Sequence, residues 1–277
     1  FRSGVGGLSI GLQSAGIEVA LGVDVDAECA KPFEQNTGSL FYSCGVEDLD
    51  ANIVQDALAP YDISILAGCA PCQPFSTYTQ TCGIPEHDHR WHLLDYFSSL
   101  VASVRPDFVT IENVAKIKSH PVFKRFLSEL HRCDYNTRYD VISCEKYGIP
   151  QTRRRLVLVA SREVPVALPE ESSSSAPVVR EVIGSLRPIA AGTADPHDSL
   201  HCASKLSPIN LKRIQASKPG GRWDQWPEEL IACCHTKTSG RTFPSVYGRM
   251  EWDKVAPTIT GQCYGFGNGR FGHPEQD

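Results

Sequence analysis

The sequence predicts an α/β protein with a doubly wound, mostly parallel sheet, followed by a smaller, irregular and mostly β domain. Short apolar runs rich in β-branched residues recur at residues 63–67, 108–111 and 156–159. Such runs are typical of buried strands. Helical apolar patterns lie between them, as at residues 93–101 and 122–130. From Arg162 on, proline, serine and turn residues with little periodicity replace these patterns, which indicates a separate module.

Length and composition are those of an ordinary globular protein. The chain has 277 residues, of which 41% are hydrophobic and 21% charged, enough for one full core and a second, smaller domain. No apolar run approaches the ~18 residues that a membrane span needs. The 11 cysteines lack the spacing of a disulfide scaffold, and no signal peptide is present, so we expect a reducing, cytoplasmic setting.

The charge balance argues against a generic nucleic-acid binder. The net charge is -5, whereas such proteins are usually basic. Residues 162–250 alone carry more Lys and Arg than Asp and Glu, and only slightly more. Any contact with DNA should therefore be made by particular arginines rather than by bulk charge.

A glycine cluster near the start predicts a binding loop. Gly4, Gly6 and Gly7 precede a helical pattern, and glycines at such a turn let backbone N–H groups approach a polar ligand. A second apolar run at residues 19–23 ends in Asp24, at the distance expected for an acid that holds ribose hydroxyls. The spacing favours a nucleoside cofactor, although Asp24 and its neighbours could instead cap the next helix.

Cys72 is the candidate nucleophile. It follows the 63–67 run and is preceded by Pro71 and followed two residues later by Pro74, so a stiff loop presents its thiol just past a strand's carboxyl end, where ligands bind in α/β sheets. Two other interpretations stay open at this point. A free cysteine is more often a small buried hydrophobe, and Cys69 with Cys72 could form a redox pair.

Glu112 and two arginines are candidate partners of this thiol. Glu112 ends the 108–111 run, so we expect it at the same edge of the sheet as Cys72. Its alternative role is a helix cap or a structural ion pair. Arg153 and Arg155 enter the 156–159 run at alternate positions, which would place them on one face. Otherwise they belong to a solvated basic patch.

Several other segments receive weaker interpretations. Residues 77–90 form a long polar connection, which beside a nucleophile favours a lid. His87, His89 and His92 lack a cysteine at zinc-site spacing, and the Cys233–Cys234–His235 group is too compact for a standard zinc site. We therefore expect no metal.

Four motifs in order resemble those of the DNA (cytosine-5) methyltransferases. Residues 3–7 read Ser-Gly-Val-Gly-Gly, residues 71–76 Pro-Cys-Gln-Pro-Phe-Ser, residues 112–114 Glu-Asn-Val and residues 151–155 Gln-Thr-Arg-Arg-Arg. The resemblance spans essentially the whole chain. One departure is Arg2, which stands where the family usually has a phenylalanine against the adenine.

The resemblance implies a Rossmann-like class I methyltransferase fold and S-adenosyl-L-methionine as the cofactor. It implies that Cys72 attacks C6 of a cytosine flipped out of the duplex, that Glu112 acts at N3, and that Arg155, supported by Arg153, holds the base. The implied cofactor contacts are Ser3, Gly4, Gly6, Gly7, Asp24, Val25, Asp48, Leu49, Pro71 and Leu93.

The implied organisation is a cofactor-binding catalytic domain at residues 1–161, a target-recognition domain at 162–250, and the start of a truncated return segment at 251–277. We expect a monomeric, prokaryotic modification enzyme that acts on double-stranded DNA, with a cognate restriction endonuclease but no stable complex. Two alternatives remain: a transfer-RNA cytosine-5 methyltransferase, whose Cys-Phe-Thr tripeptide is not found here, and an inactive DNA-binding fragment.

Overall fold

The computed structural model describes residues 3–69, 92–237, 246–261 and 263–277. It divides into two compact units. Unit 1 comprises Phe1–Ile142 and Arg154–Glu170, and unit 2 comprises Ser143–Arg153 and Glu171–Asp277. The short segment 143–153 therefore joins the second unit although it lies between two strands of the first. The functional roles assigned above to residues 1–161, 162–250 and 251–277 stay predictions.

Unit 1 alternates strands and helices along the chain. Its strands are β1 (Leu21–Asp24), β2 (Leu40–Ser43), β3 (Ile65–Cys69), β4 (Phe108–Val114), β5 (Asn136–Ser143) and β6 (Arg154–Ser161). Its α-helices are α1 (Gly7–Ser14), α2 (Ala30–Thr37), α3 (Ala51–Leu58), α5 (Leu93–Val104) and α6 (Pro121–Arg132), with short 3-10 turns η1 (Ala27–Cys29) and η4 (Ala115–Ser119). The predicted α/β class is confirmed, and each apolar run named above forms part of a strand.

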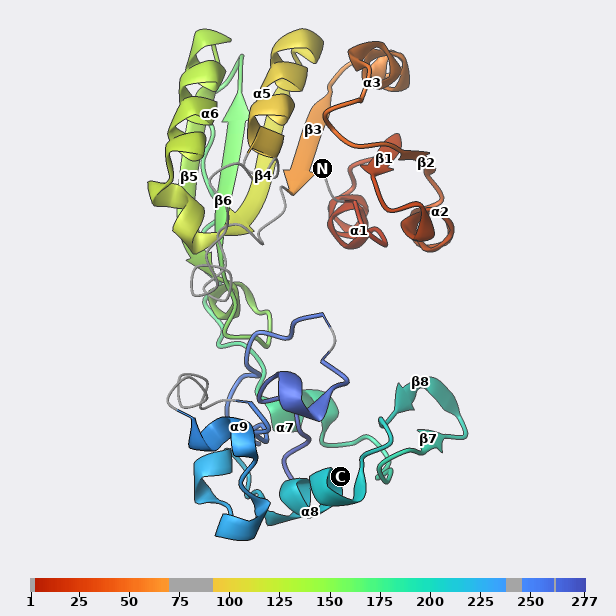
Figure 1. Cartoon of the computed structure of the whole chain (residues 1–277). Helices are drawn as coiled ribbons and strands as arrows, with labels where there is room; N and C mark the ends of the chain where they lie inside the picture. The colour runs from red at the N-terminus through yellow and green to blue at the C-terminus, as the bar shows by residue number, and fades with distance from the viewer. Residues whose placement is uncertain (1–2, 70–91, 238–245, 262) are drawn as a thin grey trace. The chain divides into compact units, whose positions relative to one another are not determined.

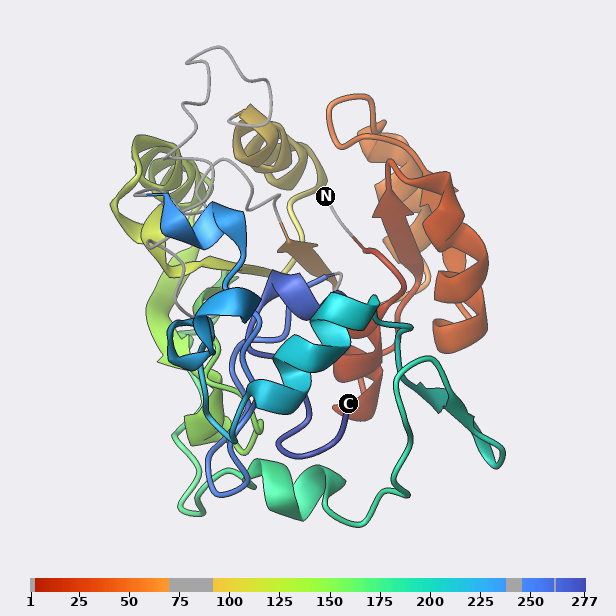
Figure 2. The ribbon, with the colours of Figure 1, turned by 60° about the horizontal axis from the view of Figure 1, so that its bottom comes forward.

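The strands form a mixed sheet system. Strands β1 and β2 pair in parallel, as do β3 and β4. Strand β6 pairs antiparallel with β4, and the larger sheet has the order β3-β4-β6-β5. Figures 1 and 2 show α5 and α6 side by side along this sheet. The parallel β3–β4 pair brings the carboxyl ends of both strands to one edge, as predicted.

One face of the larger sheet holds the main core. On β4, Val109 and Ile111 are buried, whereas the alternate positions are half-buried. Helix α6 supplies Phe123 and Phe126 to the same core. This helix begins at a strong local signal, because Pro121 occupies its first turn and the His120 ring accepts the Val122 N–H. Glu112 lies in phase with the half-buried positions of β4 and so projects from the face opposite to this core.

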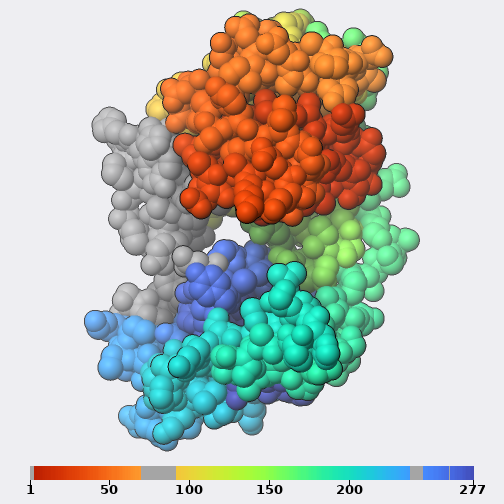
Figure 3. Space-filling view, turned by 90° about the vertical axis from the view of Figure 1, so that its right-hand side faces the viewer, coloured from red at the N-terminus to blue at the C-terminus, as the bar shows by residue number. Residues whose placement is uncertain are grey.

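An apolar cavity of about 460 Å³ lies between β1 and β3. Within the described parts of the chain these strands belong to separate sheets. The cavity is lined by residues of α1, of the β1 and β3 segments, and of α3, among them Leu12, Leu21, Leu58 and Ile65. Figure 3 shows in red to orange the outer surface that these first elements of unit 1 present.

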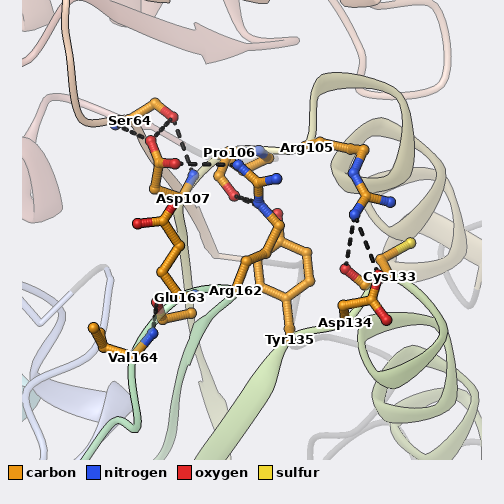
Figure 4. A network of polar contacts seen from close by, with 11 residues as sticks. Ser64, Arg105, Pro106, Asp107, Cys133, Asp134, Tyr135, Arg162, Glu163 and Val164 are labelled. Atoms are coloured by element: carbon orange, nitrogen blue, oxygen red, sulfur yellow. Dashed lines mark hydrogen bonds and ion pairs between the residues drawn. The ribbon is translucent and has the colours of Figure 1, made fainter.

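A polar network joins the amino-terminal ends of β3 and β4 (Figure 4). These ends lie at the sheet edge away from Cys69 and Glu112. The Asp107 carboxylate accepts both the N–H and the hydroxyl of Ser64 at 2.8 Å, and the Arg162 guanidinium lies 3.1 Å from its other oxygen. These hydrogen bonds, led by the Ser64 hydroxyl, lower the pKa of Asp107. Nearby, the Tyr135 hydroxyl donates to the Pro106 carbonyl, and burial raises the pKa of Tyr135 to about 12. The network holds the starts of both strands in register.

Unit 2 is irregular, as predicted, but its described residues are not mostly β. They contain one hairpin of β7 (Ala194–Asp195) and β8 (Asp198–Cys202). The helices are α7 (Val179–Ile183), α8 (Pro208–Ala216) and α9 (Cys233–Thr236), and the 3-10 turns are η5 (Cys144–Tyr147), η6 (Trp223–Gln225), η7 (Glu228–Leu230) and η9 (Phe266–Asn268). The longest of these helices, α8, has strong local signals at its start. Ser207 caps the Asn210 N–H and Pro208 opens α8, so helical turns satisfy their backbone groups without strand partners.

Buried aromatic rings organise the core of unit 2. His235 is only 4% exposed, and its ring stacks on Trp223 with centroids 4.1 Å apart. Trp226 packs beside Tyr247, and Arg213 lies over both of these rings. The role of His235 is therefore in packing.

Within the described ranges, none of the helices combines the length and the apolar composition that a membrane span requires.

Candidate active site

The glycine cluster forms a tight loop clipped to β1. Gly4 and Gly6 have φ of 52° and 97°, the left-handed region that favours glycine. A Cβ on Gly6 would lie 2.8 Å from Thr37 Cγ2, so space as well as conformation excludes a side chain. The Ser3 hydroxyl donates to the Val23 carbonyl at 2.9 Å and accepts the Val23 N–H at 2.8 Å. The predicted turn is confirmed, and Ser3 attaches it to β1.

Asp24 ties this loop to the end of β1. Asp24 is 3% exposed, and its carboxylate oxygens accept the N–H groups of Gly4 at 2.8 Å and Asp26 at 3.1 Å. The helix-capping role considered above belongs to Asp26, which accepts the Glu28 N–H. Val25 lies between the two acids and is 66% exposed. The carboxylate thus orients the loop's first amide, while Val25 offers an apolar side chain beside it.

The other predicted cofactor residues lie on neighbouring elements. Asp48 and Leu49 follow β2, with Asp48 exposed and Leu49 lining the cavity together with Ser3. Leu93 begins α5 and packs against the core. Near Asp48, burial followed by the charges of Asp48 and Glu47 raises the pKa of the Cys44 thiol. Cys44 is thereby kept protonated and is a poor nucleophile.

Glu112 is held from two sides at the carboxyl end of β4. Arg155 Nε lies 2.9 Å from Glu112 Oε1, with side-chain exposures of 17% and 31%. The Cys69 thiol donates to Glu112 Oε2 at 3.3 Å. Cys69 and Glu112 are direct register partners of the parallel β3–β4 pair, so their side chains leave the sheet on one face. Each carboxyl oxygen therefore has its own donor.

The three arginines are divided by the start of β6, which begins at Arg154. Arg155 uses one further nitrogen to donate to the Arg154 carbonyl at 2.8 Å. Arg153 precedes the strand, belongs to unit 2, and its carbonyl accepts the Cys144 N–H at 2.7 Å. The structure brings Arg155 to Glu112, and the shared face of Arg153 and Arg155 stays a prediction.

Some predicted site residues lie outside the described residues. They are Pro71, Cys72, the proposed lid at 77–90, and His87 and His89 within it. The last described residue of β3 is Cys69, three positions before Cys72. His92 is described, and its Nδ1 lies 3.3 Å from Asp95. The contact of Cys69 with Glu112 is not predicted from the sequence, because it depends on the pairing of β3 with β4.

The arrangement combines a loop suited to a nucleoside with a carboxyl group between two donors. The solved structures that resemble this chain as a whole share its fold, which is consistent with the class I methyltransferase fold. One is titled a putative DNA modification methyltransferase encoded within a prophage of Escherichia coli, with a TM-score of 0.70 at 20% identity, over 93% of this chain and 80% of that one. Another is the Entamoeba histolytica methyltransferase EhMeth, with a TM-score of 0.59 at 18% identity, over 79% and 66% of the two chains.

Sequence comparison identifies the family. The family model described as C-5 cytosine-specific DNA methylase matches residues 1–276. The Type II methylase M.HgiDII of Herpetosiphon aurantiacus is 46% identical over 99% of this chain and 78% of its own length. The Type II methyltransferase M.MthTI of Methanothermobacter thermautotrophicus is 32% identical over 59% of this chain and 48% of its own length. The chain belongs to the C-5 cytosine-specific DNA methylase family, and the predicted enzyme class is confirmed.

Proposed function

We propose that this protein transfers a methyl group to C5 of a flipped cytosine in double-stranded DNA through a covalent bond between Cys72 and C6. The observation that carries the proposal is the Glu112 carboxyl group, held between Arg155 and Cys69 at the carboxyl end of β4. This carboxyl group lies at the same edge of the sheet as the end of β3. Strand β3 is the one that leads into the Pro-Cys-Gln-Pro segment at residues 71–74. A carboxyl held in this way is suited to a proton transfer on a bound base.

The chemistry explains why these residue types are needed. C5 of cytosine is a weak nucleophile because the ring carbonyl and imine withdraw its electrons. When the Cys72 thiolate adds to C6, the C5–C6 π electrons are redistributed toward C5 and N3. Glu112 donates or shares a proton at N3, which leaves an enamine with electron density on C5. After C5 has taken the methyl group, a base removes the C5 proton, the C6–S bond breaks to regenerate the thiolate, and N3 returns its proton to Glu112.

Arg155 supports this step in two ways. Its Nε orients Glu112, and the rest of its guanidinium can donate to O2 of the cytosine. The charge that develops on the ring is then shared between a carboxyl and a guanidinium that are already in place, which lowers the reorganisation needed in the transition state. Arg153, two residues before Arg155 in the chain, would support Arg155 or reach a phosphate of the DNA.

The residues of the glycine loop fit S-adenosylmethionine, which when bound supplies an electrophilic methyl group. Gly4 and Gly7 have no atom within 4 Å of the place where a side chain would start, so the backbone of the loop is open to a ligand there. Asp24 has one accepted hydrogen bond on each oxygen, and a carboxylate oxygen can accept a second from a ribose hydroxyl. Val25 would pack on the adenine, Asp48 and Leu49 would contact its edge, and Pro71 and Leu93 would complete the pocket.

The choice of DNA sequence resides, in this proposal, in residues 162–250. These residues differ in composition from the rest, and loops of this kind read bases by individual side chains. Exchanging this segment with that of a relative should transfer the relative's methylated sequence. The names of the relatives support a Type II modification role. The proposal further includes an enzyme that acts as a monomer and a restriction endonuclease that acts on the same site without a stable complex.

The test is trapping on DNA that contains 5-fluorocytosine. Fluorine at C5 blocks the elimination step, so the Cys72 adduct should persist through denaturation. Cys72→Ser should abolish the adduct, whereas Cys234→Ser, an exposed cysteine in unit 2, should leave it unchanged. A denaturation-resistant band with Cys72→Ser would overturn the assignment. Bisulfite mapping of DNA from expressing cells then gives the substrate and the target sequence.

A further inference from the structure

Cys69 is a half-buried thiol at the end of a strand, beside a carboxyl group. It is the last described residue of β3, it is paired in register with Glu112, and it also lines the cavity of unit 1. Its sulfur lies 3.3 Å from Glu112 Oε2, a contact between residues 43 positions apart. The opposite oxygen, Oε1, faces Arg155 Nε at 2.9 Å. The two contacts therefore act on different oxygens of one carboxyl group.

Two donors on different oxygens restrict the carboxyl plane more than one donor does. The final torsion of a glutamate is broad, because it joins a tetrahedral to a planar carbon. The ion pair at Oε1 acts on one oxygen and restricts the position of the other less. A second donor at Oε2 limits the rotation and so fixes which lone pair is presented to a bound base.

A thiol is suited to this task by its weakness as a donor. Arginine neutralises much of the charge on a carboxylate through a strong hydrogen bond. A second strong donor would hold the carboxylate more firmly and oppose its protonation. The S–H group donates weakly, so it can orient Oε2 while Glu112 remains able to exchange a proton with its substrate.

We propose that Cys69 is a positioning residue that orients Glu112 for the proton transfer at N3 of the cytosine. This inference rests on the proposed function of Glu112. Cys69 acts through the carboxyl group and does not touch the base. The role differs from that of a packing residue, which would affect stability, and from that of a redox partner of Cys72, which would affect activity only after oxidation.

A double-mutant cycle tests the coupling in the full chain under reducing conditions. Four proteins are compared with the unchanged enzyme: Cys69→Ala, Cys69→Ser, Glu112→Gln and the double variant Cys69→Ala/Glu112→Gln. The readouts are the single-turnover methylation rate, the KM for DNA and the midpoint of thermal unfolding. Cys69→Ser retains a donor of similar size and serves as the matched conservative control.

We expect Cys69→Ala to lower the single-turnover rate about tenfold while the KM for DNA changes less than twofold, since orientation matters for the step and not for binding. Cys69→Ser should recover most of this loss and stay within about threefold of the unchanged rate, because its hydroxyl still orients Oε2; the loss that remains reflects its greater strength as a donor, which opposes protonation of Glu112. In the Glu112→Gln background, Cys69→Ala should change the rate by less than twofold, because the group through which it acts is no longer an acid.

Two results would overturn the inference. One is an equal loss from Cys69→Ala in both backgrounds, which would make its effect independent of Glu112. The other is equal loss with Ala and Ser accompanied by a lower unfolding midpoint, which would reduce Cys69 to a packing role. An unchanged rate for Glu112→Gln alone is a separate result. It overturns the proposed function of Glu112 itself and, with it, any role for Cys69 through that group.

Discussion

Arg155 Nε lies 2.9 Å from Glu112 Oε1 across two antiparallel strands. Arg155 is the register partner of Val114, and Glu112 is the partner of Val157, so the two charged residues are diagonal neighbours on one face of the sheet. The pair is only partly exposed, which screens it less than a surface ion pair. Because Arg155 makes this contact, its effect can be separated by mutation from that of the neighbouring Arg154.

Arg155→Ala should lower the methylation rate by on the order of 10²-fold, because Glu112 loses the donor at Oε1 and the base loses a charged partner. Arg154→Ala is the matched control. Arg154 is exposed and opens the same strand, and its carbonyl still accepts from Arg155, so its rate should stay within about twofold. Single-turnover assays on one DNA duplex compare the two. Similar losses in both variants would show that only the local positive charge matters.

Gly22→Ala should destabilise unit 1 by about 1–3 kcal/mol, because there is no room for a methyl group. A Cβ on Gly22 would lie 2.2 Å from Phe33 Cζ, and Phe33 is fully buried. Gly11 in α1 has no atom within 4 Å of the same position, so Gly11→Ala should be neutral or stabilising by about 0.5–1 kcal/mol. Urea unfolding followed by circular dichroism measures both. A stable Gly22→Ala would mean that the Phe33 ring can move away.

Asp107→Asn should destabilise unit 1 by about 1–3 kcal/mol at neutral pH, since the Asp107 carboxylate accepts from Ser64 and pairs with Arg162. The pKa of Asp107 is lowered on folding, mainly by the Ser64 hydroxyl. Its contribution is thus present above the unfolded pKa and is lost as the pH falls through the folded one. The difference in unfolding free energy between the two proteins should therefore narrow below about pH 4.

Asp140→Asn is the control for this acid, because Asp140 pairs with Lys118 at 2.8 Å on an exposed surface. Exposed pairs of this kind contribute little to stability, because water and salt screen them. Denaturant titrations at several pH values compare the variants. An Asp107→Asn effect as small as that of Asp140→Asn would show that the network does not hold the strand ends.

Unit 2 should lose stability as the pH falls below about 6.5, the ordinary pKa of histidine. Burial, and secondarily the charge of Arg213, lowers the pKa of His235. Between the unfolded and the folded pKa, His235 is protonated in the unfolded chain and neutral in the folded unit. The free energy of unfolding therefore falls as the pH drops toward the folded pKa. His235→Phe keeps a ring against Trp223 and should flatten this dependence.

Tryptophan fluorescence at pH 5 to 8 follows the transition, since Trp223 stacks on His235. His197→Gln, a change at an exposed histidine, should leave the pH dependence as it is. Burial also lowers the pKa of His273, so His235→Phe should reduce the slope rather than remove it. An unchanged slope would assign the effect to His273.

The sequence by itself determined several elements of unit 1, and the family. The apolar run at 108–111 and the helical pattern at 122–130 are local signals, because a strand or helix of this kind needs only its own pattern of burial. The glycine turn before α1 was predictable for the same reason, since only glycine enters a left-handed turn without strain. The four motifs in order were sufficient to indicate the DNA (cytosine-5) methyltransferases.

Tertiary structure alone decided which side chains meet. The contact of Cys69 with Glu112 depends on the register of two parallel strands, and that of Arg155 with Glu112 depends on β6 running antiparallel to β4. The bond from Gly4 to Asp24 likewise joins a loop to a strand end 20 positions away. A one-residue slip in register would turn each side chain to the other face. Local periodicity carries no record of register, because the pattern of burial along one strand is the same for several alignments with its neighbour.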